Sequence, residues 1–394
     1  MIQTSALPPR VGRLKAEMAK HDIDVIVSFK PENSFYFTGF NPIIYSHPVI
    51  AILTRDHDPI MLVHALRDDH GRASAWVPDI RLYGSWSTKV TMGPNWQDAL
   101  ASILSDLGLA GKTVGIEEEF ISIQRMKQLR AALPDSNFAD ASHLIDHCRL
   151  IKDPDEIAHA RIAARVADHG MDTAVSVLAA GGNEREVAIA SMHEMNKLWA
   201  SEYPDVEVAD FGSLEGGVQN GMATWVLSGP RMFFNCDNPT QRKPQRGEAV
   251  SVLIWTIANG IHAENERTIA MGSLPDANRR ALDAILEIRD EVDRLIRPGT
   301  PYKELFEKTR EGLKARGYGA NIPGRIGHGI GLGAHEHSSL DAASTLVLEP
   351  GMLFTFEPNI RVPGVCATQI SDTVLITDDG REYLTRSAGG YLEV

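Results

Sequence analysis

Short apolar runs alternate with amphipathic stretches through the N-terminal part of the chain. Residues 10–21 and 95–109 place apolar side chains at helical spacing, which predicts two helices with one buried face each. The runs at 24–29, 49–54 and 59–64 are short and rich in β-branched residues, which is typical of buried strands. Because strands and helices alternate along this part of the chain, we expect a small α/β domain.

A helix-start pattern near residue 153 marks the beginning of a second domain. Asp153 can cap a helix whose first position is Pro154, and acidic residues follow in the first turn. The amphipathic pattern then continues to about residue 178. We therefore expect an N-terminal domain over residues 1–152 and a C-terminal domain over residues 153–394.

The C-terminal part combines helices with a strand-rich region. Long apolar runs after residue 221 predict antiparallel strands, and residues 368–380 alternate apolar and polar positions before an Asp-Asp-Gly turn. Helical spacing predicts helices at 183–200, at 275–296 and within 298–319. A small α/β domain is thus followed along the chain by an antiparallel sheet with covering helices. This combination places the chain in the α+β class.

Composition and charge narrow the possible partners. The 394 residues carry 39 basic and 52 acidic side chains, a net charge of −13, which argues against nucleic acid or an anionic membrane as the main partner. No apolar run approaches the roughly 18–20 residues that span a bilayer. The cysteines Cys148, Cys236 and Cys366 are sparse and odd in number, so we expect no disulfide framework and a cytoplasmic location.

Four stretches in the C-terminal part carry a family resemblance. They are RLIKDPDEI at 149–157, GHGIGLGAHEH at 327–337, GMLFTFEPNI at 351–360 and ISDTVLITDDG at 370–380. Their order and spacing resemble the prolidase/aminopeptidase P/creatinase superfamily across about 230 residues. The resemblance implies a C-terminal pita-bread domain with the active site, and a smaller N-terminal α/β domain of the creatinase type.

Peptidases of this superfamily hold two metal ions with five ligands, and the resemblance gives each ligand a position here. The positions are Leu253, Glu264, His328, Glu357 and Ser371, where the family has Asp, Asp, His, Glu and Glu. Leucine cannot ligate, and a serine hydroxyl is a poor ligand for a hard dication. The remaining histidine and two carboxylates could hold one ion or form a metal-free polar cluster. We expect the metal-free cluster, with no metal and no cofactor.

Residues 228–268 resemble creatinase, a relative that works without metal. The match implies that Glu266 and Glu357 grip a planar guanidinium, since forked N–H groups fit paired carboxylates. The family also implies a homodimer in which the N-terminal domain closes the partner's site, with His47 near the carboxylate of a small-molecule substrate. His262 replaces a tyrosine of the family and is a further candidate for substrate binding.

One position departs from creatinase at the centre of this match. Cys236 stands where creatinase has its acid/base histidine, and Asp237 follows it. Cys236 is either a nucleophile with a lowered thiol pKa or an inert small residue, and Asp237 is an alternative base. In the glycine-rich stretch at 327–337, called the histidine loop below, we expect His328 to move protons, and the resemblance implies that His335 polarises the bond that is cleaved.

Three functions remain open on these residues. The main expectation is a metal-independent, creatinase-like hydrolase of a C–N bond in a small guanidino, ureido or cyclic-amidine metabolite; ectoine hydrolases, relatives with similarly altered ligands, extend this class beyond creatine. Trp225 and Tyr45 would then wall a cationic substrate, although plain packing also explains either residue. The alternatives are an Xaa-Pro aminopeptidase or prolidase with one metal ion, and a catalytically inactive binding protein.

Overall fold

Two compact units divide the chain in the computed structural model, which describes residues 7–212, 216–389 and 391–394. The first unit contains Met1–Arg149 together with Asp210–Gln219, and the second contains Leu150–Ala209 together with Asn220–Val394. The segment from Asp210 therefore returns to the N-terminal unit, where the ring of Phe211 lies 5.3 Å from the ring of Phe35. Among the described residues, no helix has the length and apolarity needed to cross a membrane.

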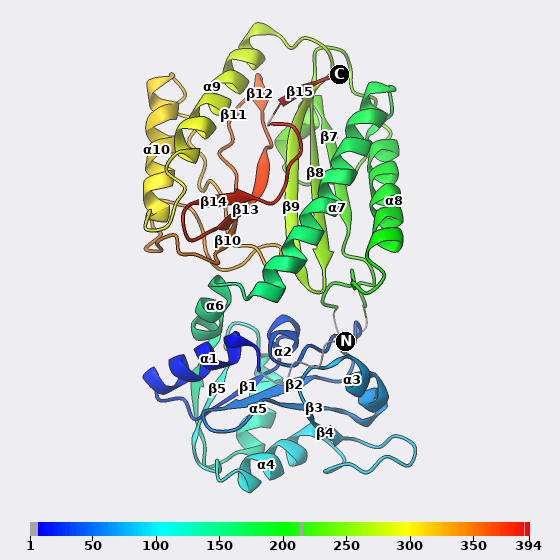
Figure 1. The fold of residues 1–394 in the computed structure, drawn as a ribbon, viewed down its shortest axis with the longest axis vertical. Coiled ribbons are helices and arrows are strands. Elements are labelled where there is room, and N and C mark those ends of the chain that lie inside the picture. Colours follow the sequence, from blue (N-terminus) through cyan, green and yellow to red (C-terminus); the bar gives the residue numbers. More distant parts are fainter. Residues whose placement is uncertain (1–6, 213–215, 390) are drawn as a thin grey trace. The chain divides into compact units, whose positions relative to one another are not determined.

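A six-stranded mixed sheet forms the centre of the N-terminal unit, in the strand order β4-β3-β2-β1-β5-β6 (Figure 1). Strand β1 pairs antiparallel with β2 and parallel with β5, and helix α4 buries its apolar face against the sheet. This arrangement confirms the predicted mixture of strands and helices. The elements are α1 (Pro9–Lys20), β1 (Val25–Ser28), α2 (Pro31–Thr38), β2 (Ile50–Thr54), β3 (Ile60–His64), η1 (Ala65–Arg67), α3 (Asp68–Ser74), β4 (Asp79–Tyr83), α4 (Trp96–Asp106), β5 (Thr113–Ile116), α5 (Ile123–Ala132), β6 (Asn137–Asp140) and α6 (Ser142–Leu150).

A seven-stranded sheet forms the centre of the C-terminal unit, with the path β10-β13-β9-β8-β7, β14 beside β13 and β15 beside β9. Helices α7 and α8 pack on β7, β8 and β9, while α9 and α10 pack on β10 and β13 (Figure 1). The elements are α7 (Pro154–Ala179), α8 (Glu184–Glu202), β7 (Ala223–Ser228), η2 (Gly229–Phe234), β8 (Ala249–Ala258), β9 (Ile261–Ala270), α9 (Asp276–Asp293), α10 (Tyr302–Ala315), β10 (Leu353–Phe356), β11 (Arg361–Val362), β12 (Cys366–Ala367), β13 (Ser371–Ile376), β14 (Arg381–Tyr383) and β15 (Tyr391–Glu393).

Two helix starts follow directly from the local sequence. Asp153 and Glu156 form a capping box at the start of α7, and Asn183 and Glu186 form another at the start of α8. In the second box the Asn183 side chain accepts from the Glu186 N–H at 3.0 Å, while the Glu186 carboxylate accepts from the Asn183 N–H at 2.8 Å. Both helix starts agree with the sequence prediction, because capping depends only on residues three positions apart.

The two-residue repeat of β8 and β9 decides which side chains face the helices. Ile254 of β8 joins the core beneath α7 and α8, and the amide of Asn265 on β9 donates to Asp168 of α7 at 2.8 Å. Side chains one position away point to the other face of the sheet. Glu264 and Glu266 therefore share the face that lies away from α7.

A buried ion cluster holds the helix side of this sheet together. The carboxylate of Asp372 on β13 accepts from Arg267 of β9 at 2.6 Å and from Arg289 of α9 at 2.8 Å. The Thr385 hydroxyl also donates to Asp372, at 3.0 Å. Because one carboxylate compensates two buried guanidinium groups, Asp372 connects three elements of the unit.

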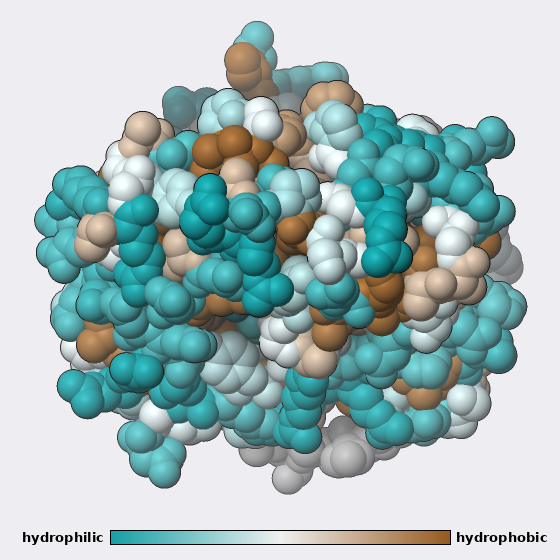
Figure 2. Space-filling model, turned by 90° about the horizontal axis from the view of Figure 1, so that it is seen from above, coloured by the Kyte–Doolittle hydropathy of each residue, from teal (hydrophilic) through white to brown (hydrophobic). Residues whose placement is uncertain are grey.

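Hydrophilic residues cover most of the molecular face that Figure 2 shows, which looks down on the upper end of Figure 1. Hydrophobic residues form scattered patches on this face rather than one continuous area. This distribution agrees with a chain whose net charge is −13.

Candidate active site

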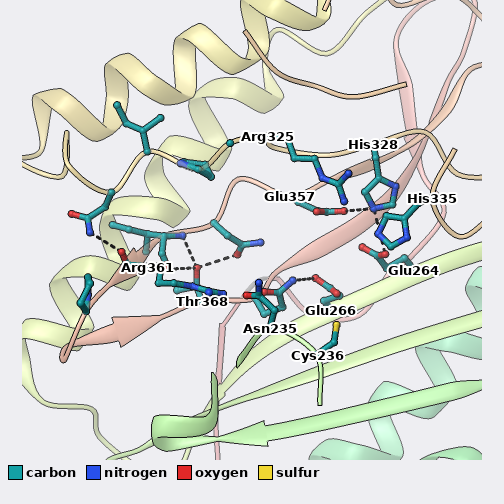
Figure 3. Close-up of a pocket in the computed structure, with 18 of the residues that line it drawn as sticks. Asn235, Cys236, Glu264, Glu266, Arg325, His328, His335, Glu357, Arg361 and Thr368 are labelled. Carbon is teal, nitrogen blue, oxygen red and sulfur yellow. Dashed lines mark hydrogen bonds and ion pairs between the residues drawn. The ribbon is translucent and has the colours of Figure 1, made fainter. Parts of the chain in front are cut away.

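A cavity of about 650 Å³ lies on the sheet face that carries Glu264 and Glu266 (Figure 3). Its volume is in the range of sites for small molecules. The lining comes from the loop after η2, from β8 and β9, from the histidine loop and from the segment around β11. The residues labelled in Figure 3 are Asn235, Cys236, Glu264, Glu266, Arg325, His328, His335, Glu357, Arg361 and Thr368.

Glu264, His328 and Glu357 bring three potential ligand atoms together in this cavity. Nε2 of His328 lies 3.0 Å from a carboxylate oxygen of Glu357 and 3.7 Å from one of Glu264. One donor atom from each residue lies within 4.8 Å of the other two. An imidazole and two carboxylates are a donor set that fits one divalent ion with open coordination positions.

The surroundings of His328 direct one ring nitrogen toward the two carboxylates. Nδ1 lies 2.9 Å from the carbonyl oxygen of Gly329, which can only accept, so Nδ1 carries a proton and donates it there. Nε2 then offers a lone pair to a cation. A backbone carbonyl on the far nitrogen is a common way of orienting a metal-binding histidine. Trp255 similarly holds Glu264, with Nε1 donating to its carboxylate at 2.8 Å.

Glycines let the histidine loop pack tightly on β10. A Cβ atom added at Gly327, where φ is +149°, would lie 2.0 Å from the carbonyl oxygen of Thr355. A Cβ atom at Gly329 would lie 2.3 Å from Oγ of Ser338. Larger residues at either position would displace the backbone that carries His328.

Three buried carboxyl groups interact in the cavity. Burial raises the pKa of Glu264 well above its ordinary value, and the charges of Glu266 and Glu357 raise it further. Burial, with the charge of Glu357, also raises the pKa of Glu266 to about 8. Burial acts in the same direction on Glu357, but the hydrogen bond and charge of His328 outweigh it and lower the pKa of Glu357 to about 2. A cation between these groups would favour their ionised forms.

The two positions that lack a family ligand are filled by other side chains. Leu253 is 1% exposed and lies opposite Glu266 in the β8–β9 pairing. Ser371 is fully buried on β13, with its hydroxyl 3.5 Å from a carboxylate oxygen of Glu357. Within the described part of the cavity, the donor atoms therefore form a single cluster of a histidine and two carboxylates.

His335 lies beside this donor set. The centroid of its ring is 4.2 Å from that of His328 and 5.3 Å from that of Trp255. Burial, together with the charges of His328 and Arg325, lowers the pKa of His335 to about 4. The ring is therefore neutral at neutral pH, and a neutral imidazole can donate a hydrogen bond to a substrate carbonyl.

Three of the predicted substrate-binding residues do not line the cavity. Trp225 packs its ring 4.8 Å from that of Trp255, on the adjacent strand. Asp237 is exposed and forms an ion pair with Arg231 at 3.2 Å. His262 is buried, and its Nδ1 lies 2.9 Å from a carbonyl oxygen of the histidine loop. Trp225 thus lies behind Trp255, which does line the cavity, while the partners of Asp237 and His262 lie outside the lining.

Tyr45 and His47 belong to the N-terminal unit. The Tyr45 side chain is buried there, and its hydroxyl donates to the side-chain oxygen of Asn41 at 3.2 Å. The His47 ring stacks on the His64 ring, with 4.0 Å between centroids. The role of His47 in closing a partner's site stays a prediction.

Cys236 lines the cavity near Glu266, but its surroundings disfavour a thiolate. Although the Cys236 side chain is exposed, partial desolvation by its surroundings raises the pKa of the thiol, and the negative charge of Glu266 raises it further. A nucleophilic cysteine needs the opposite shift, which usually comes from a cation or a helix N-terminus. These surroundings favour the inert alternative.

Alkylation kinetics test the state of this thiol. Cys148 and Cys366 are buried, so iodoacetamide should label Cys236 first. We expect slow labelling at neutral pH, because the raised pKa keeps this thiol protonated. The labelling rate should continue to rise with pH in the range where an ordinary thiol is already fully ionised. Cys236→Ser supplies the background rate. Rapid labelling that is already maximal near neutral pH would contradict the expectation.

Gln369, Arg361 and Arg325 also line the cavity, and the motifs did not single them out. The amide of Gln369 donates to the Glu266 carboxylate at 2.7 Å. The one signal in the sequence is that each of these residues stands within four positions of a family motif. Closeness to a motif in the sequence does not by itself distinguish residues that line the cavity from residues at the surface.

Comparisons with known proteins cover both units. The model of metallopeptidase family M24 matches residues 158–378, which is more than half of the chain. The model of the creatinase/prolidase N-terminal domain matches residues 10–151. An uncharacterized peptidase of Staphylococcus aureus (strain bovine RF122 / ET3-1) is 26% identical over 376 residues, covering 95% of this chain and 98% of that protein.

Two solved structures are similar over nearly their whole length. The prolidase from Pyrococcus furiosus is 26% identical with a TM-score of 0.77, covering 95% of this chain and 99% of that chain. The Xaa-Pro dipeptidase from Bacillus anthracis is 23% identical with a TM-score of 0.82, covering 98% of this chain and 99% of that chain. These likenesses confirm the predicted pita-bread fold and its superfamily.

The same comparisons correct the expected function. The main expectation, a metal-independent amidinohydrolase acting on a non-peptide C–N bond, is wrong because the matched family and these relatives are peptidases. The geometry agrees with this correction, because the Glu357 carboxylate lies 3.0 Å from His328 and completes a cluster of potential metal ligands with Glu264. The chain is therefore a hydrolase that belongs to metallopeptidase family M24.

Proposed function

We propose that this protein hydrolyses the peptide bond of small peptides of the Xaa-Pro type, with one divalent metal ion held by Glu264, His328 and Glu357. The observation that carries the proposal is the convergence of these three donors, within 4.8 Å of one another in a small-molecule cavity. The names of the similar proteins, a prolidase and an Xaa-Pro dipeptidase, support this substrate class.

One ion fits this chain better than two. A second ion would need carboxylates at Leu253 and Ser371, and neither side chain supplies one. The remaining ligands are one histidine and two carboxylates. Such a set binds one ion and leaves some of its coordination positions open. When bound, the ion would polarise a carbonyl group and lower the pKa of a water molecule.

The remaining side chains suit binding and proton transfer. Glu266 lines the cavity but lies outside the donor triple, and Gln369 holds one of its oxygens at 2.7 Å. Its other oxygen has no hydrogen-bond partner among the described residues, so it can exchange a proton with the substrate. His335 is positioned beside His328 to donate to the carbonyl oxygen of the bond that is cleaved.

Metal analysis together with peptide hydrolysis tests the proposal. We expect purified protein to bind about one Mn²⁺, Co²⁺ or Zn²⁺ ion per chain, as a single donor set of this kind allows. Hydrolysis of Xaa-Pro dipeptides should disappear after treatment with a chelator and return when the ion is added back. Undiminished activity in protein shown to be metal-free would overturn the metal assignment. Absence of hydrolysis across a panel of loaded enzyme and Xaa-Pro dipeptides would overturn the substrate class.

A further inference from the structure

A second cavity, of about 290 Å³, lies within the N-terminal unit. Its lining comes from the segments that leave β1 and β5, which are parallel neighbours in the sheet. From β1 the chain continues to β2 on one side, while β5 lies on the other side. In open sheets with parallel strands, ligands commonly bind outside the carboxyl ends of two strands whose connections leave in opposite directions. The cavity therefore lies where such a sheet usually holds a small ligand.

Two opposite charges line this cavity. Glu32 stands in the first turn of α2, after β1, and Arg125 stands in the first turn of α5, after β5. Neither the Glu32 carboxylate nor the Arg125 guanidinium forms an ion pair or a hydrogen bond with any described residue. Burial lowers the pKa of the Arg125 guanidinium, since no neighbouring carboxylate compensates its charge. A ligand that carries both an ammonium and a carboxylate group would satisfy both side chains.

The rest of the lining is largely aromatic. Four aromatic side chains contribute to it: Phe29, Tyr45, Phe120 and Phe211. Phe120 is 45% exposed although it lines the cavity, so an apolar ligand group would remove part of its ring from water. Aromatic rings pair favourably with another ring in edge-to-face or offset geometry. The lining thus suits a ligand that adds an aromatic group to its two charges.

The two charges lie beside different rings of this lining. Burial raises the pKa of the Tyr45 hydroxyl, and the negative charges of Glu32 and Asp210 raise it further, which places Glu32 near Tyr45. The Arg125 guanidinium lies over the Phe29 ring, 5.0 Å from its centroid. A ligand ammonium group is therefore favoured at the Tyr45 side of the cavity, and a carboxylate at the Phe29 side.

We propose that this cavity binds a free α-amino acid with an aromatic side chain, whose ammonium group pairs with Glu32 and whose carboxylate pairs with Arg125. A free amino acid carries both charges on one carbon atom, so a cavity of this size can meet both at once. A peptide separates its two terminal charges by at least one further residue. The site shares no residue with the candidate active site, so the inference goes beyond the proposed peptidase function and does not depend on it.

Four probes that differ by one group test the inference by calorimetry on the full chain. L-Phenylalanine carries all three groups, 3-phenylpropionate lacks the ammonium, phenethylamine lacks the carboxylate and L-alanine lacks the ring. We expect L-phenylalanine to bind about 10- to 100-fold more tightly than 3-phenylpropionate and phenethylamine, as for one charge-assisted contact. L-Alanine should also bind more weakly, by at least about 10-fold, because it leaves the rings uncovered. Treatment with a chelator beforehand prevents the amino acids from binding to a metal ion in the candidate active site.

Two variants assign each charge of the ligand to one side chain. Glu32→Gln should weaken binding of L-phenylalanine by about 10- to 100-fold and leave that of 3-phenylpropionate unchanged. Arg125→Gln should weaken binding of L-phenylalanine to a similar extent and leave that of phenethylamine unchanged. Both variants should fold normally, because neither substitution leaves a buried partner unpaired. Circular dichroism and thermal unfolding check this.

Arg130→Gln is the matched control on the same helix. Its guanidinium also lies over a phenylalanine ring, 5.7 Å from the centroid of Phe138, but Arg130 does not line the cavity. It should bind L-phenylalanine as the wild type does. Full affinity for L-phenylalanine in folded Glu32→Gln and Arg125→Gln proteins would overturn the site, and so would an equal loss in Arg130→Gln or no binding to the wild type at millimolar concentration. Equal affinity for L-alanine would overturn the aromatic class. None of these readouts involves peptide hydrolysis, so failure here leaves the proposed function untouched.

Discussion

Glu264→Gln and Glu266→Gln are expected to abolish most activity for different reasons, although the two residues lie two positions apart on one face of β9. Glu266→Gln should lower kcat by on the order of 10²- to 10⁴-fold, the usual contribution of an acid/base group, while the bound ion is kept. Glu264→Gln removes a charged metal ligand and should weaken ion binding by at least about 10- to 100-fold. Losses of this size are usual even when the changed residue only forms a hydrogen bond to a metal ligand. Metal stoichiometry and Xaa-Pro hydrolysis, measured on the same samples, separate the two effects.

Glu287→Gln serves as the control for this pair, since its side chain is largely exposed and pairs with Arg316 at the surface. It should leave ion content and hydrolysis unchanged. If Glu266→Gln lost its ion along with its activity, Glu266 would count as a ligand and the donor set would need a fourth member. If Glu264→Gln kept both, the assignment of the metal site would be wrong.

Asp372→Asn is expected to destabilise the C-terminal unit by about 3–5 kcal/mol, the cost of breaking a buried ion pair on one side. The carboxylate compensates Arg267 and Arg289, which are 2% and 7% exposed, so its loss leaves two buried guanidinium groups without an anion. Urea unfolding, followed by hydrogen exchange of peptides from β9 and β13, would measure the change in free energy in the unit where it arises.

Asp283→Asn is the matched control within the same unit. Asp283 pairs with Arg279 at 2.8 Å, but both side chains are close to half exposed. Solvent screens such a pair, so its removal should cost at most about 1 kcal/mol. Similar losses in the two variants would show that Asp372 acts as an ordinary surface acid rather than as the centre of a buried cluster.

The fold was largely predictable because its strongest signals are local. Apolar periodicity located two helices and three strands of the N-terminal unit and the long helices of the C-terminal unit, and the capping pattern at Asp153 located the start of α7. The return of Asp210–Gln219 to the N-terminal unit had no such signal. Packing of Phe211 against Phe35 depends on residues 176 positions apart, which no local pattern encodes.

The candidate site was predictable in part. Motif spacing identified Glu264, Glu266, His328, His335 and Glu357, and the structure brings all five to one cavity. The same reasoning also proposed Trp225, Asp237 and His262, whose side chains the structure engages elsewhere. A motif assigns a residue to a segment, but the direction of its side chain depends on neighbouring segments.

The sequence by itself determined which functional groups are available and on which face of a strand they lie. Leu253 and Ser371 exclude two carboxylate ligands whatever the fold, and the two-residue repeat of β9 puts Glu264 and Glu266 on one side. Only the tertiary structure decided that His328 points Nε2 at Glu264 and Glu357, and that Arg361 lines the same cavity. The physical reason is that a strand's faces follow from adjacent residues, whereas convergence and ion pairing depend on the pairing of segments far apart in the chain.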